Sequence, residues 1–138
     1  MFYLKKTLTF KRINFKLNAS IMRHNFKNLS IWQRSRKLVK EVYLITKTFP
    51  KDEKFGLISQ MNRSAISIPS NIAEGCGRTT NPQLVYFLDN AIALNCELET
   101  QFYLSFDLSY LPKDTLDKYV NELSEIRRMI IAFSNKYR

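Results

Sequence analysis

Glycine, cysteine and histidine are scarce in this chain of 138 residues, which has 3 glycines, 2 cysteines and 1 histidine. The cysteines, Cys76 and Cys96, form no CxxC pair, and His24 is distant from both in sequence, so we expect no metal site. Both are predicted to be free thiols in a reducing cytoplasm. Because glycine is rare and 45% of the residues are apolar, the composition favours an ordered, mostly helical chain.

Long apolar runs are also missing. No stretch approaches the roughly 20 apolar residues that span a bilayer, so no membrane-spanning segment is predicted and no membrane partner is expected. The length fits one domain with a real core. We find no internal repeat, no low-complexity stretch and no pair of strands.

Acidic residues are absent from residues 1–40, which hold eleven of the 22 lysines and arginines. The other eleven basic residues are balanced by 12 acidic ones, so the remainder of this +10 chain is close to neutral. A basic head on a neutral body indicates an anionic partner, such as nucleic acid or a membrane surface.

Residues 1–24 are predicted to be a basic N-terminal extension, and residues 25–138 the folded domain. Apolar residues alternate only over short pieces of residues 1–21, and the segment lacks the continuous apolar stretch of a secretory signal. We interpret it as a disordered tail or as an extension ahead of a true start at Met22. A transit peptide or a membrane-surface arm is the alternative.

Four amphipathic helices are predicted from the apolar spacing. Ser30 is predicted to cap the first helix, which ends at Pro50, and Asn81 to cap the third. The second begins near residues 54–56, and the fourth follows a turn at residues 109–112. Helices of this length with short connections predict an all-α, antiparallel, up-and-down four-helix bundle. The expected apolar stripes are Ile31, Ser35, Leu38, Val42, Ile45 and Phe49; Leu57, Met61, Ala65, Ile68 and Ile72; Leu84, Leu88, Ala91, Leu98 and Phe102, with Asn95 between; and Leu116, Tyr119, Leu123, Ile126, Ile130, Phe133 and Tyr137.

Pro69 interrupts the second helix and predicts a kink there, because it removes a backbone donor and frees the carbonyl of Ala65. Such a proline costs roughly 3 kcal/mol in a helix interior, so packing or assembly should compensate. The bend either wraps the helix around its core or shapes a subunit contact. Ser67 and Ser70 are candidates to bond freed carbonyls.

The segment Gly75–Arg78 is interpreted as a connection, with its glycines supplying a left-handed helix end. Catalysis by Cys76 lacks a base nearby in sequence, and a phosphate cradle would need a preceding strand. Glu97 and Glu99 are two residues apart and cannot form one acid–base pair. We therefore predict no catalytic residue and no cofactor; an enzyme would need a deep pocket lined by carboxylates.

Two sets of polar residues remain. A structural network is predicted around an Arg63–Glu97 ion pair, within or between subunits, and comprises Gln60, Arg63, Asn71, Glu74, Glu97 and Glu99. A basic stripe opposite the apolar face of the first helix, flanked by Tyr43, is either an ordinary solvated face or a nucleic-acid surface. No motif for base readout accompanies it, so binding would be to backbone and shape. The candidate nucleic-acid-binding residues are Arg36, Lys37, Lys40, Lys47 and Lys51.

Several motifs resemble the 23S rRNA intervening-sequence protein family over about residues 25–137. They are Trp32-Gln33, Phe49-Pro50, Gly56-Leu57, Gln60, Arg63, SIPSNIAEG at residues 67–75, Gly77-Arg78, Phe87-Leu88 and ELET at residues 97–100. The resemblance implies a bacterial cytosolic protein, a left-handed bundle and a ring-like homo-oligomer, expected to be a pentamer. It carries no catalytic residue. The chain departs from the family pattern in its N-terminal head and in Ala93-Leu94-Asn95, where small residues are common.

These features predict a non-enzymatic oligomeric bundle that associates with RNA, as rRNA or a ribonucleoprotein, through basic surface residues. Some family members are encoded inside insertions in large-subunit rRNA genes. A related branch, the accessory proteins of diversity-generating retroelements, works with a reverse transcriptase. The alternative is therefore a scaffold that recruits a protein partner such as a reverse transcriptase.

Overall fold

The computed structural model describes residues 23–138, and most of the predicted extension, residues 1–22, lies outside the described residues. The described part is all helical, with no strand, which confirms the all-α prediction. Two 3-10 turns accompany four long helices. The elements are η1 (Phe26–Asn28), α2 (Ser30–Thr46), η2 (Lys51–Glu53), α3 (Leu57–Cys76), α4 (Asn81–Asp107) and α5 (Lys113–Asn135).

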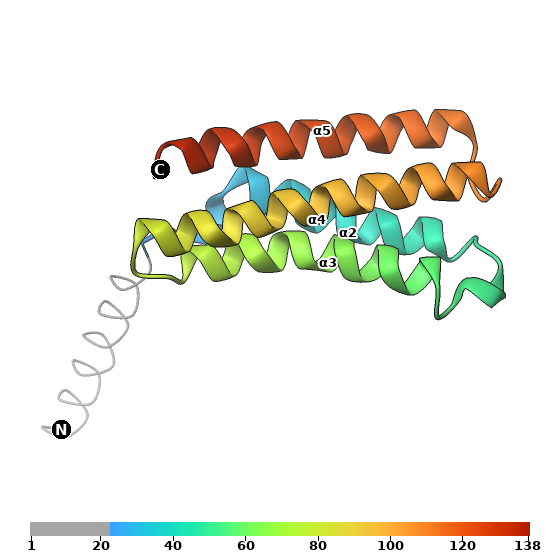
Figure 1. The fold of residues 1–138 in the computed structure, drawn as a ribbon, viewed down its shortest axis with the longest axis horizontal. Coiled ribbons are helices and arrows are strands. Elements are labelled where there is room, and N and C mark those ends of the chain that lie inside the picture. Colours follow the sequence, from blue (N-terminus) through green and yellow to red (C-terminus); the bar gives the residue numbers. More distant parts are fainter. Residues whose placement is uncertain (1–22) are drawn as a thin grey trace, which may run out of the picture.

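The four helices lie side by side with their axes close to one direction (Figure 1). The α2–α3 and α4–α5 connections lie at one end of the molecule, and the α3–α4 connection lies at the other. The α3–α4 contact is the most extensive, whereas α2 shares few contacts with α5. The face of α2 that turns away from α3 and α5 is therefore available to solvent.

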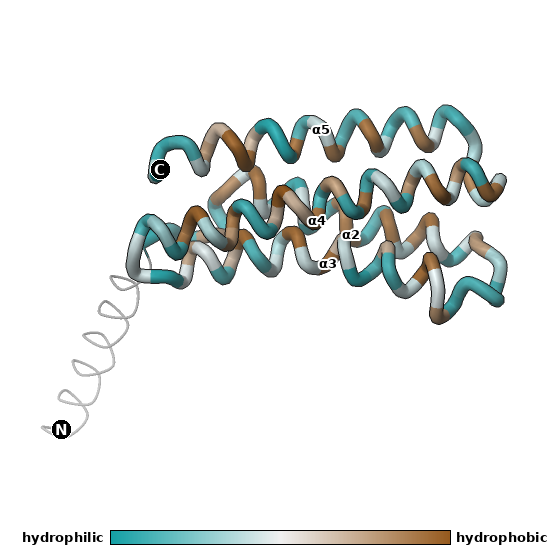
Figure 2. Tube along the Cα trace, in the orientation of Figure 1, coloured by the Kyte–Doolittle hydropathy of each residue, from teal (hydrophilic) through white to brown (hydrophobic). Residues whose placement is uncertain are grey.

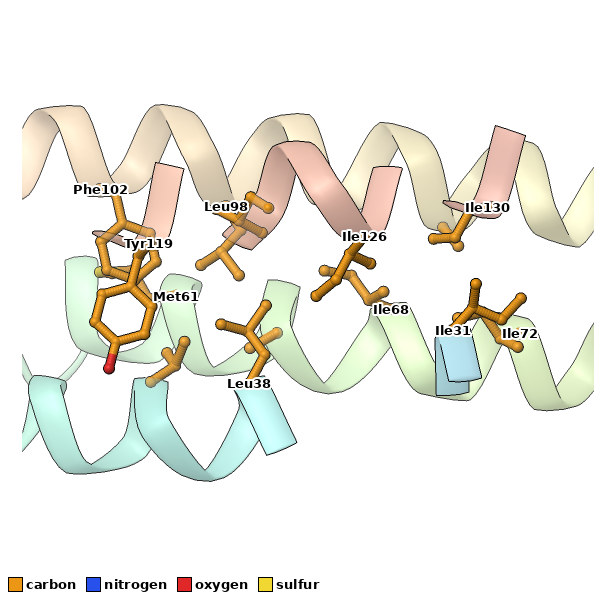
Figure 3. Close-up of a cluster of buried hydrophobic side chains, with 14 of the residues drawn as sticks. Ile31, Leu38, Met61, Ile68, Ile72, Leu98, Phe102, Tyr119, Ile126 and Ile130 are labelled. Atoms are coloured by element: carbon orange, nitrogen blue, oxygen red, sulfur yellow. The ribbon is translucent and has the colours of Figure 1, made fainter. Parts of the chain in front are cut away.

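The core is built from the predicted stripes. Leu38, Met61, Ile68, Leu98 and Ile126 come from four different helices and converge on a shared interior (Figure 3). All of them are at most 1% exposed. Apolar and hydrophilic residues recur in turn along the helices (Figure 2), as expected of amphipathic helices. Truncating such a side chain to alanine typically lowers the free energy of unfolding by about 2–5 kcal/mol. Burial of these side chains is therefore the main source of the stability of the bundle.

The helix starts are shifted by one residue from the predicted caps. Leu29, not Ser30, precedes α2, and no side chain caps that end. At α4, Thr80 is the N-cap, and its hydroxyl accepts a hydrogen bond from the Gln83 amide at 3.4 Å. Asn81 is the first helical residue and Pro82 lies in the first turn. Thr80 and Asn81 are both good capping residues, so sequence does not distinguish between them.

The prediction of a left-handed glycine at the end of α3 is wrong. Gly77 has φ −81° and ψ −6°, which is right-handed helical backbone, and no described glycine has positive φ. Gly75 is buried inside α3. A Cβ at Gly75 would lie 3.1 Å from Phe87 Cβ and 3.2 Å from the Leu84 carbonyl oxygen. Gly75 is therefore required by the close approach of α3 and α4, not by backbone conformation.

Helix α3 continues through Pro69 without a break in its helical assignment. The Ser67 hydroxyl donates to the Arg63 carbonyl at 2.7 Å, and the Ser70 hydroxyl donates to the Ile66 carbonyl at 2.9 Å. Neither hydroxyl donates to Ala65, the residue whose carbonyl loses its amide donor at Pro69. The serines thus bond the helix backbone, but at positions other than the one that the proline frees.

His24, at the end of the predicted extension, packs onto the bundle. Its ring lies 5.5 Å from the Phe133 ring and 5.0 Å from the Tyr137 ring, centroid to centroid, in edge-on geometry. Burial, aided by the charge of Arg23, lowers the pKa of His24 below its ordinary value. The contact with α5 therefore begins at His24, one residue before the predicted start of the folded domain.

Candidate nucleic-acid interface

The outer face of α2 concentrates positive charge. Arg36, Lys40 and Lys47 are all exposed. At about 100° per residue, they lie within about 40° of one another around the helix axis. Trp32 and Tyr43 extend this sector to about 80°. We call this surface the α2 basic face: Trp32, Arg36, Lys40, Tyr43 and Lys47.

The single acidic residue of α2, Glu41, lies outside this sector, at about 140° from Arg36. It lines pockets that α2 shares with α5 and with the α4–α5 connection. The α2 basic face is therefore free of carboxylates from its own helix, and its positive potential is not cancelled locally.

The five predicted nucleic-acid-binding residues do not form one surface. Lys37 lies about 100° from Arg36 and lines a small pocket against α5 that also contains Glu41 and Glu122. Lys51 lies beyond the end of α2, in η2, where helical spacing does not apply. It nevertheless lines the same pocket as Lys47, because η2 folds back beside the end of α2.

Two open, apolar pockets lie between α2 and α3, near the two ends of the α2 basic face. The first, of about 370 Å³, is lined by Phe26, Trp32, Arg36, Val39, Ile66, Pro69, Ser70 and Ala73. The second, of about 290 Å³, is lined by Tyr43, Thr46, Lys47, Phe49, Lys51, Lys54, Ile58 and Asn62. Among the described residues that line them, none is acidic. Lys54 is a basic residue of this surface that the sequence analysis missed, because only the η2 turn brings it here.

Arg34, another cation of α2, is already paired with a carboxylate of α5. The guanidinium of Arg34 donates to both carboxylate oxygens of Glu122 in α5, at 3.0 and 2.7 Å. This hydrogen-bonded pair raises the pKa of Arg34 above its ordinary value. Arg34 therefore joins α2 to α5 and is not free to bind an external anion.

The predicted Arg63–Glu97 ion pair is present within one chain, between α3 and α4. Arg63 Nε also donates to Gln60 Oε1 at 3.1 Å, and Gln101 Nε2 donates to Glu97 Oε1 at 3.3 Å. Both charged side chains are more than one-third exposed, so solvent screens the pair strongly. The cluster of Gln60, Arg63, Glu97 and Gln101 orients α3 against α4.

Glu99 belongs to a separate network that the sequence analysis missed. Arg127 Nη1, from α5, donates to Glu99 Oε2 at 3.1 Å and to Asn95 Oδ1 at 2.8 Å. Asn95 is fully buried and donates from Nδ2 to the Leu123 carbonyl at 2.9 Å. As expected from their spacing, Glu97 and Glu99 serve different partner helices. A polar Asn95 in an apolar slot was the only sequence signal for this network.

The remaining predicted network members lie apart. Asn71 Nδ2 donates to the Ser67 carbonyl at 2.7 Å, one turn back in α3. Glu74 is exposed near the end of α3. Neither joins the Arg63 or the Arg127 cluster, so the predicted network of six residues divides into smaller parts. The helical spacing alone could not show which neighbouring helix each polar residue would meet.

The two cysteines lie in different surroundings, Cys76 buried and Cys96 exposed. Cys76 is fully buried, and burial raises the pKa of its thiol to about 11. It is therefore a protonated, poorly nucleophilic thiol at neutral pH. Among residues 23–138 no cluster of histidine, cysteine, aspartate and glutamate is suited to a metal ion. No helix in that range combines the length and the apolarity needed to cross a bilayer.

Comparison with known proteins places the chain in a family. Residues 27–132 match the family described as 23S rRNA-intervening sequence protein. The chain belongs to this family. The resemblance seen in the sequence motifs is thereby confirmed, and the match covers all of α2, α3 and α4 and most of α5. No match is found among curated proteins.

A solved structure has a similar fold. It is a protein of unknown function from the S23 ribosomal protein family of Bacteroides thetaiotaomicron. The two share 21% sequence identity with a TM-score of 0.71, and the match covers 76% of this chain and 95% of the other. This 23S rRNA-intervening sequence protein and that S23 relative therefore have the same fold.

Proposed function

We propose that this protein is a non-enzymatic, oligomeric four-helix bundle that associates with RNA, as rRNA or within a ribonucleoprotein, through the α2 basic face. The observation that carries the proposal is the clustering of three exposed cations on a helix face that has no carboxylate of its own. Lysine and arginine neutralise phosphates and release counterions, which gives affinity without sequence readout. The family name supports rRNA as the class of nucleic acid.

Other features fit this proposal. The buried, protonated thiol of Cys76 argues against nucleophilic catalysis at the end of α3. A cytoplasmic location is part of the proposal, because ribosomal RNA is made and assembled there. We further propose that the helices form an antiparallel, up-and-down bundle and that α3 bends at Pro69. Such a bend would shape the wall of the pocket that Pro69 shares with Trp32.

The test is RNA binding by the full chain across a range of salt concentrations. The variant Arg36→Glu/Lys40→Glu/Lys47→Glu should lose most of its affinity for a structured rRNA fragment. Each phosphate contact contributes about 0.7–0.9 to the salt slope, so removing three contacts should reduce the slope by at least about two.

The matched control is Lys113→Glu/Arg128→Glu/Lys136→Glu, which makes the same change of net charge at exposed positions of α5 and its C-cap. This variant should bind RNA more tightly than the α2 variant. Equal losses in both variants would show that only the net charge matters and would overturn the assignment to α2. Undiminished binding by the α2 variant would do the same.

A protein-interaction scaffold is the second candidate, and the outer face of α4 favours it. Tyr86 and Leu104 of α4 and its C-cap residue Leu108 are 61%, 47% and 53% exposed. They lie within about 40° around the helix axis, with Tyr86 about 27 Å from Leu104 along it. Exposed apolar groups on one face mark contacts with other proteins. We propose that this α4 apolar face (Tyr86, Leu104 and Leu108) joins copies of this chain in a homo-oligomer, expected to be a pentamer. If it does not, it is the surface for a protein partner such as a reverse transcriptase.

A further inference from the structure

Aromatic rings are interleaved with cations along the α2 basic face. In chain order the face presents Trp32, Arg36, Lys40, Tyr43 and Lys47. Trp32 and Tyr43 are eleven residues apart, which places their Cα atoms about 16 Å apart along the helix axis. Cations that track a phosphate backbone, interleaved with rings on which bases stack, are the arrangement that single-stranded nucleic acid requires.

The pocket at the Trp32 end is open and apolar, which suits the flat face of an unpaired base. Its walls are the Trp32 ring on α2 and the apolar side chains of Ile66 and Pro69 on α3. Ile66 is 42% exposed, although it neighbours buried residues of the same helix. The Arg36 guanidinium carbon lies over the half-buried Trp32 ring, 5.5 Å from its centre, and the Phe26 ring packs edge-on against it. An aromatic surface and a cation for the adjoining phosphate therefore occur together.

The pocket at the Tyr43 end repeats this combination with different residues. Tyr43, which is 39% exposed, lies beside the apolar side chains of Phe49 and Ile58. The cations of Lys47, Lys51 and Lys54 line the same pocket. Asn62 adds an amide to its wall, with Oδ1 accepting a hydrogen bond from Thr46 Oγ1 at 3.0 Å. The two ends of the face thus present the same chemistry.

We propose that the α2 basic face binds single-stranded RNA by taking unpaired bases into these two pockets and stacking them on Trp32 and Tyr43. The proposal rests on the RNA association proposed above and names the kind of RNA. Bases inside a duplex are stacked on both sides and cannot enter a pocket, whereas loops, bulges and ends can turn their bases outward.

The experiment compares two RNA probes on the full chain, by fluorescence anisotropy at fixed salt. One is a single strand of roughly 12 nucleotides, and the other is the same strand annealed to its complement. Trp32 is the only tryptophan of the chain, so its emission reports stacking directly. We expect the single strand to bind at least about tenfold more tightly and to quench Trp32 emission, because each stacked base adds affinity that the duplex cannot supply.

Substitutions separate stacking from charge. Trp32→Leu and Tyr43→Leu should each weaken single-strand binding by about five- to a hundredfold while leaving duplex binding unchanged. Tyr43→Phe keeps the ring and should bind like the parent chain. Tyr103→Leu removes an exposed ring from α4 and serves as the control. Circular dichroism verifies that each variant folds. If Trp32→Leu does not fold, the comparison of Tyr43→Leu with Tyr43→Phe tests the stacking.

The outcomes distinguish this inference from the proposed function. Equal affinity for both probes, with unchanged Trp32 emission, would overturn stacking and leave RNA association through charge intact. RNA binding that survives the triple α2 charge reversal would overturn the proposed function itself. If neither RNA binds and Tyr43→Leu instead lowers the molecular mass in solution, the face is a contact between copies of this chain and both proposals fail.

Discussion

The side chain of Arg127 joins two helices that sequence analysis treated independently. It donates to Asn95 and to Glu99 on α4, and the Arg127 and Glu99 side chains are only 23% and 22% exposed. Removing the guanidinium leaves a fully buried amide oxygen without its donor and a half-buried carboxylate without its counter-charge. Unpaired groups of this kind cost more than the pair gains.

We predict that Arg127→Ala lowers the free energy of unfolding by roughly 2–3 kcal/mol, measured by chemical denaturation. The matched control is Arg128→Ala, which truncates the next side chain of α5. Its side chain is 68% exposed and pairs with Glu125 one turn away, so its loss should cost less than about 0.5 kcal/mol. Similar costs for the two variants would contradict a structural role for Arg127.

Asn95 shows how much of this network could be predicted from the sequence. A polar residue at an apolar position of a helix predicts a buried hydrogen bond, and Asn95 is indeed buried. The partner could not be read, because Arg127 meets Asn95 only through the register of α5 on α4. In the same way, Glu99 was assigned to the Arg63 network on the basis of its helix, and the structure gives it to the opposite neighbour.

At the scale of elements, the closest approach of α3 and α4 depends on the missing side chain of Gly75. Any Cβ there would press on Phe87 and on the Leu84 backbone at 3.1–3.2 Å, which is tighter than ordinary packing. Neither Leu84 nor Phe87 can move freely, since Leu84 is buried and Phe87 lies under the Arg78 guanidinium. An added methyl group would therefore separate the two helices.

We predict that Gly75→Ala destabilises the protein by roughly 1–3 kcal/mol through overpacking. Gly77→Ala is the control two residues on, where φ is −81° and the nearest atom to an added Cβ is 3.4 Å away. That substitution should be neutral or should stabilise by up to about 1 kcal/mol. Thermal unfolding of both variants checks the pair, and the reverse order of stability would restore the interpretation of Gly75 as a simple helix end.

Pro69 also affects the shape of a whole element, α3. The sequence indicated a compensating reason for an interior proline, and the structure shows Pro69 in the wall of the pocket shared with Trp32. Pro69→Ala would restore the amide that bonds Ala65, so it should not lower the stability of α3. An unchanged curvature of α3 in a crystal structure of this variant would contradict the bend proposed above.

At the scale of the whole molecule, the exposed apolar side chains of Tyr86, Leu104 and Leu108 bear on assembly. We predict that the protein is larger than its chain mass of 16.3 kDa in sedimentation equilibrium. Leu104→Lys should shift it toward the monomer, because a charge in the middle of an apolar contact is costly to bury. Leu44→Lys is the control: it alters a side chain that is 54% exposed on α2. A monomer in the parent chain at all concentrations would contradict assembly through the α4 apolar face.

The sequence by itself determined the local structure of this protein. The number of helices, their approximate ends and their buried faces follow from apolar spacing and from proline and polar signals, because these depend on residues close together in the chain. Leu38, Met61, Leu98 and Ile126 were all predicted to be inside and are. The motifs around residues 67–75 and 97–100 were sufficient to identify the family.

Only the tertiary structure decided which surfaces those helices share. It set Lys37 beside Glu122 of α5, and it brought Lys51 and Lys54 beside Lys47 through the η2 turn. It also set Gly75 against α4 and Arg127 against Asn95. Each of these relations depends on the rotation and register of one helix against another. Many residues far apart in the chain determine that geometry together, so no local pattern encodes it.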